Sequence, residues 1–61
     1  MAIAKVDALK IWDRFFSLNG NKHLKKTKQM CYDYLDEKIQ KETNPYERRH
    51  LRSVKQEIEK L

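Results

Sequence analysis

The chain of 61 residues contains a single glycine and a single proline, so few positions can interrupt a regular helix. Gly20 lies in an Asn-Gly-Asn sequence, where glycine can adopt the left-handed conformation that closes a helix. Pro45 follows Asn44, a favourable helix N-cap, and Glu47 occupies the third helical position, as in a capping box. These two breaks predict three helices, at about residues 4–18, 23–42 and 45–61.

Apolar residues recur with a helical period in all three segments. In the first segment they cover about half of the helix circumference, which is wider than an outer helix of a small bundle needs. We therefore expect this face either to be wedged between the other two helices or to be covered by a second copy of the chain. The third segment carries a narrow apolar seam, formed by Leu51, Val54, Ile58 and Leu61.

Strand-like alternation of apolar and polar residues is missing from the sequence, and the predicted connections between helices are short. The expected fold is one all-α domain over residues 1–61, a small three-helix bundle. The second and third helices either pack antiparallel or cross as in a helix-turn-helix motif, and the sequence leaves both arrangements open. The expected core consists of Trp12, Phe15, Phe16, Leu35, Ile39, Leu51, Val54 and Ile58.

The formal charge is +5, and the positive charge is concentrated in two windows. Residues 22–28 and 48–55 hold eight basic residues and no acidic one, whereas the rest of the chain is net negative. Both windows lie in the opening turns of predicted helices, where the helix dipole disfavours each exposed cation by about 0.3–1 kcal/mol. Asp33, Asp36 and Glu37 lie in the middle of the second predicted helix, where we expect them to relieve none of this charge.

A phosphate or carboxylate at these helix starts would make the arrangement favourable. Arg48, Arg52 and Lys55 share one helix face, directed away from the apolar seam, and can therefore follow a phosphate backbone. The first hypothesis is a small cytoplasmic accessory or regulatory protein that binds DNA or RNA through phosphates. Its candidate binding residues are Lys22, Lys25, Lys26, Lys28, Arg48, Arg49, Arg52 and Lys55. The competing explanation of these charges is a solvated surface that serves solubility alone.

A second hypothesis is a protein-interaction module, either an adaptor or inhibitor with an acidic partner or a homo-oligomer such as a dimer. Its interface would combine the wide apolar face of the first helix with the seam of the third helix. The residues expected at this interface are Ile11, Phe15 and Leu18.

Catalysis, cofactors and metals are not expected. His23, Cys31 and His50 do not stand at the spacing with which one helix holds a metal, and the single glycine excludes a glycine-rich phosphate loop. Cys31 lies on the apolar stripe of the second segment, so we expect a buried and inert thiol. One cysteine allows no internal disulfide, and no stretch is apolar enough for a signal or a membrane span. We therefore expect a cytoplasmic protein that has no membrane partner.

Overall fold

The computed structural model describes residues 3–61, so Met1 and Ala2 of the expected domain lie outside the described residues. It contains three helices, α1 (Ala4–Leu18), α2 (Leu24–Lys41) and α3 (Pro45–Glu59), and no strand within the described range. The predicted three-helix bundle is confirmed. The predicted helix ends are also close to the observed ones, because the breaks at Gly20 and Pro45 act locally.

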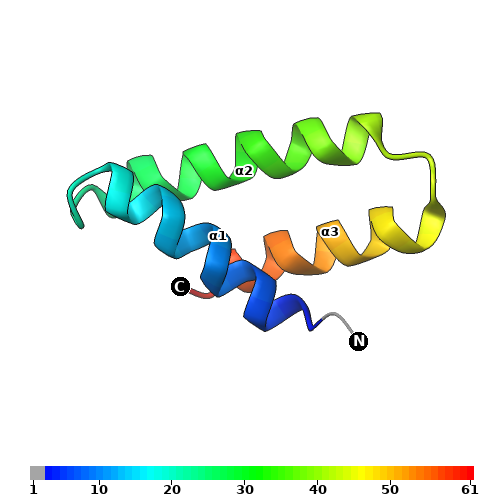
Figure 1. Ribbon diagram of the computed structural model, residues 1–61, viewed down its shortest axis with the longest axis horizontal. Coiled ribbons are helices and arrows are strands. Elements are labelled where there is room, and N and C mark those ends of the chain that lie inside the picture. Colours follow the sequence, from blue (N-terminus) through cyan, green and yellow to red (C-terminus); the bar gives the residue numbers. More distant parts are fainter. Residues whose placement is uncertain (1–2) are drawn as a thin grey trace.

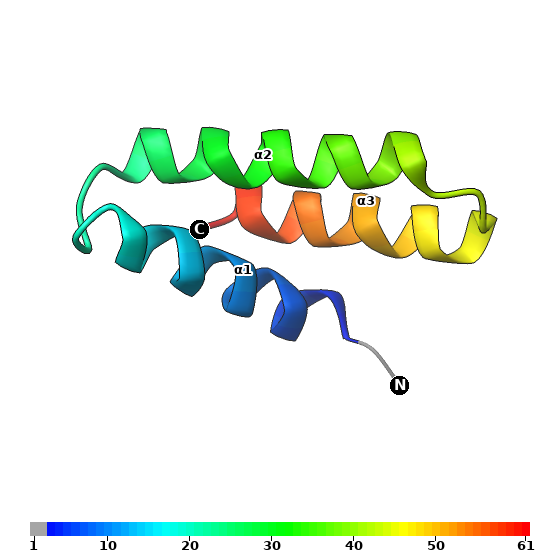
Figure 2. The ribbon, with the colours of Figure 1, turned by 45° about the horizontal axis from the view of Figure 1, so that its top comes forward.

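Helices α2 and α3 run antiparallel and side by side along the length of the molecule, which measures 34 × 22 × 16 Å (Figures 1 and 2). We call this pair the α2–α3 hairpin. Helix α1 packs obliquely across the hairpin and contacts both of its helices. The second and third helices therefore do not cross as in a helix-turn-helix motif, and their first turns lie at opposite ends of the hairpin.

The helix end at Gly20 and the Asn44 cap have the expected geometry, but the capping box is incomplete, because the Asn44 amide donates to the Glu42 carboxylate at 3.0 Å and not to Glu47. Gly20 follows α1 with φ +68°, and its amide donates to the Ser17 carbonyl at 3.0 Å, while the Asn21 amide donates to the Phe16 carbonyl at 2.9 Å. This pair of bonds is a Schellman motif, which glycine permits at no steric cost. At the start of α3, the Asn44 side-chain oxygen accepts hydrogen bonds from the amides of Tyr46 and Glu47, at 2.9 and 3.4 Å.

The fully buried core consists of small and medium-sized side chains rather than aromatic rings. Its members are Ala8, Thr27, Cys31, Leu35, Val54 and Ile58. The buried Thr27 hydroxyl accepts a hydrogen bond from the Asn19 side chain at 3.0 Å, so this polar group is not left unsatisfied. Ala8 is the fully buried residue of α1, because its small side chain lets this helix approach the hairpin closely.

The expectation of a core centred on aromatic residues is wrong in one respect. Trp12, Phe15 and Leu51 pack against the buried cluster but are only half-buried, and Ile39 and Phe16 are half-buried as well. Phe16 stacks on Trp12 at a centroid distance of 5.5 Å. The oblique approach of α1 brings its alanine to the centre of the contact, so the larger rings close the edges of the core. Leu35, Val54 and Ile58 are fully buried, as predicted.

Replacement of Asn44 by alanine removes the side-chain cap of α3. We expect N44A to lower the free energy of unfolding by about 1 kcal/mol, because two amides of the first turn lose their acceptor. Urea denaturation followed by circular dichroism measures the change. T43A is the matched control, since Thr43 is the exposed neighbour of Asn44. Equal stability of N44A and T43A would contradict a stabilising role for this cap.

Candidate functional site

Two tyrosines show how α2 is oriented within the bundle. Tyr34 packs edge-on against Phe15 of α1, with ring centroids 5.6 Å apart. Tyr32 lies instead beneath the ammonium group of Lys55 in α3, 5.5 Å from the ring centroid. Residues two apart on a helix point in directions about 200° apart, so these tyrosines mark opposite sides of α2. One side of the hairpin is therefore covered by α1, and the other side is open.

The open side of the hairpin carries basic residues from both windows. On α3, Arg48 and Arg52 share a face with Lys55, whose side chain reaches α2. On α2, Lys25 and Lys28 share a face with Tyr32, and the Lys28 side chain reaches α3. The antiparallel packing thus brings two sequence-distant windows onto one surface. We call this surface the basic face, and its members are Lys25, Lys28, Arg48, Arg52 and Lys55.

The other three candidate cations lie off the basic face. Lys22 is exposed in the connection before α2, and Lys26 is exposed on the side of α2 away from Tyr32. Arg49 lies beside the basic face rather than on it. Together with Pro45, Arg48 and Arg52, it lines an open depression of about 280 Å³ at the start of α3.

Two members of the basic face already have partners within the chain. The Lys55 ammonium lies 2.8 Å from a carboxylate oxygen of Asp36. The expectation that the acidic residues of α2 relieve none of the basic charge is therefore wrong for Asp36, because α3 packs with Lys55 directly beside it. Lys28 donates to the backbone carbonyl of Glu59 at 3.3 Å, near the end of α3, where the helix dipole favours a cation. Glu37 pairs with Lys41, one turn further along α2, at 2.8 Å.

The remaining candidate cations are exposed and form no ion pair within residues 3–61. They are Lys22, Lys25, Lys26, Arg48, Arg49 and Arg52. Helix α2 spans 18 residues, which places the cations at its start about 27 Å from those at the start of α3. The structure therefore concentrates uncompensated positive charge at the two ends of the hairpin.

The two helix starts differ in how they accommodate this charge. The residue before α2, His23, has φ +64° and gives no side-chain cap, and the first turn of α2 contains no acidic residue. The free amides and the lysines at the start of α2 carry positive charge, partial and full respectively. An anion bound there would relieve the repulsion between them. The first turn of α3 has both the Asn44 cap and the acidic Glu47. The unfavourable placement of cations at helix starts, predicted from the sequence, therefore persists at α2 and is partly relieved at α3.

The other candidate groups have structural environments. Cys31 is fully buried, and burial raises the pKa of its thiol, as expected for an unreactive core residue. His50 lies 2.6 Å from an Asp7 carboxylate oxygen and joins α3 to α1. Sequence reasoning missed this contact, because nothing local signals a pairing across 43 positions. No group of three or more potential metal-binding side chains occurs among the described residues.

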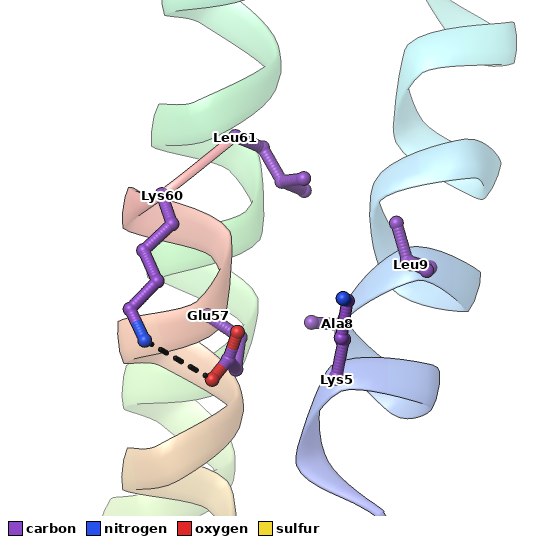
Figure 3. Close-up of a pocket in the computed structure, with 6 residues that line it drawn as sticks. All are labelled: Lys5, Ala8, Leu9, Glu57, Lys60 and Leu61. Atoms are coloured by element: carbon purple, nitrogen blue, oxygen red, sulfur yellow. Dashed lines mark hydrogen bonds and ion pairs between the residues drawn. The ribbon is translucent and has the colours of Figure 1, made fainter.

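The apolar surface of α1 is divided between the core and the solvent. Ile11 and Phe15, two expected interface residues, pack against the bundle's own core, whereas Leu18 is 70% exposed. Two further residues, Val6 and Leu9, are exposed as well, and we call them the outer face of α1. Leu9 borders a cavity of about 240 Å³ between α1 and the end of α3, where the Leu61 side chain points toward α1 (Figure 3).

The seam of α3 is largely consumed by the fold, since Val54 and Ile58 are buried and Leu51 packs against them. In the described part of the chain, no helix combines the length and the apolar character that crossing a membrane requires. No protein-family model, curated protein or solved structure matches the chain.

Proposed function

We propose that the chain is a small, non-enzymatic cytoplasmic protein that binds nucleic acid through phosphate contacts, in an accessory or regulatory role. The observation that carries this proposal is the basic face, together with its neighbouring cations at both ends of the hairpin. Three exposed lysines at the start of α2 repel one another and the dipole of that helix, and three exposed arginines in the first turns of α3 repel one another. A polyanion that lies along the hairpin relieves both repulsions.

Phosphates are the favoured anion because arginine dominates the α3 end of the face. Arg48 and Arg52 are one helical turn apart, and guanidinium groups bind phosphate oxygens in a bidentate manner. The contacts are to the backbone of the nucleic acid, so affinity depends strongly on salt and only weakly on base sequence.

The double variant R48A/R52A tests the α3 end of the basic face. We expect the slope of log K against log salt to become shallower by about 2, because two phosphate contacts and their released counterions are lost. Fluorescence anisotropy with a labelled duplex of about 16 base pairs, at about 50 to 200 mM salt, measures the slope.

The matched control for this experiment is K5A/K10A, which removes the same net charge from exposed positions on α1. If binding occurs on the basic face, the slope of log K against log salt for K5A/K10A stays close to that of the parent protein. An equal loss of slope in both variants would show that binding follows net charge rather than this surface. No binding by the parent protein at low salt would overturn the proposal.

A second candidate function is self-association through the outer face of α1. Val6 and Leu9 are 44% and 46% exposed. Leu61, which is 49% exposed, borders the same cavity as Leu9 from the opposite wall (Figure 3). A second copy of the chain would remove this surface from water, which favours association by about 25 cal/mol per Å². Leu9 is the part of the wide apolar arc of α1 that this face contains.

Replacing Leu9 with serine separates this candidate from the interface expected from the sequence. We expect L9S to shift the sedimentation coefficient toward that of a 7.4 kDa monomer, whereas L18S leaves association unchanged. Both side chains are exposed, so helical circular dichroism should persist in both variants. A parent protein that sediments as a monomer at the highest attainable concentration would rule out this second function.

A further inference from the structure

We infer that the basic face fits the backbone of double-stranded nucleic acid better than that of a single strand, an inference that rests on the proposed function. The juxtaposition that carries it is a rigid pair of antiparallel helices with free cations at both ends and no free aromatic ring between them. The shared ligand chemistry is a regularly spaced double row of phosphodiesters, whether of DNA or of RNA.

The basic face presents no free aromatic ring on which a base could stack. Proteins that bind single strands stack bases on exposed aromatic rings within a basic groove. The tyrosine on the basic face, Tyr32, is half-buried against the core, and the Lys55 ammonium lies over its ring. Tyr46 is 78% exposed, but it lies about 160° around α3 from Arg48, off the basic face. A single strand would therefore gain charge contacts on this surface without base stacking.

A duplex offers more phosphate charge than a single strand over the length of the basic face. The free cations at the two ends of the face, Lys25 on one side and Arg48 with Arg52 on the other, are held apart by the hairpin, whose helix α2 is about 27 Å long. Duplex DNA carries one charge per about 1.7 Å of axis, so about 16 phosphates fall within this span, against about 8 for one strand. A duplex is also already ordered, whereas a flexible strand loses conformational freedom when both ends are fixed.

Between the two ends of the face, the charge of Lys55 is compensated by Asp36. At the α2 end, Lys28 is held by the carbonyl of Glu59, and Lys25 is the cation of the face that stays free there. Binding should therefore concentrate at the two ends of the hairpin. On a duplex these ends are separated by about 8 base pairs along the axis, which gives the face a minimum ligand length.

Hairpin oligonucleotides of about 5 and about 10 base pairs, as DNA and as RNA, test this inference against unpaired strands of equal phosphate number. We expect the longer duplex, of one or both nucleic acids, to bind at least about tenfold more tightly than its matched unpaired strand at about 50 mM salt. We also expect it to bind at least about fivefold more tightly than the shorter duplex. Comparison of the DNA hairpins with the RNA hairpins shows which duplex is preferred.

Two single lysine variants test the role of the α2 end. K25A removes the contact at the α2 end of the basic face and should reduce the affinity of the longer duplex to near that of the shorter one. K10A removes the same charge from an exposed position on α1 and should retain the length dependence. Equal or tighter binding of unpaired strands, or equal loss in K25A and K10A, would overturn the inference and leave phosphate binding intact. No binding of any probe would overturn the proposed function as well.

Discussion

The packing of α2 against α3 is the interaction on which the rest of the structure depends. Cys31 and Leu35 of α2 meet Val54 and Ile58 of α3 in a fully buried cluster, and α1 adds Ala8 to it. Each large apolar side chain in such a cluster contributes about 1.5–3 kcal/mol, and a chain of this length has few of them. The hairpin formed by this packing has two sides, of which α1 covers only one.

The open side explains how a small fold can present charge without neutralising it. Interhelical bonds of Lys28 and Lys55 lie across the hairpin and favour its register, but exposed contacts of this kind contribute only about 0–1 kcal/mol each. Lys25, Arg48 and Arg52, nearer the two ends of the hairpin, form no ion pair within residues 3–61 and stay exposed. The uncapped start of α2 adds free amides of the same polarity. Core packing and the basic face therefore follow from the same antiparallel arrangement.

Features that depend on neighbouring residues could be predicted from the sequence, and those that depend on helix orientation could not. Gly20 and Asn44 act within one turn of chain, and Cys31 is recognisable as buried from its place on an apolar stripe. The partial exposure of Trp12 follows from the oblique path of α1, which no local pattern specifies. The pairing of Lys55 with Asp36 requires the register of α3 against α2, and the two cationic windows become one surface only when the side covered by α1 is known.

Amide chemical-shift mapping with a short duplex tests the central claim most directly, because it reports the contacted surface residue by residue. On titration with a hairpin duplex of about 10 base pairs, the account predicts the largest ¹H–¹⁵N shift changes near Lys25, Arg48 and Arg52, with small changes along α1. Changes confined to α1 around Leu9, or no changes at low salt, would contradict it.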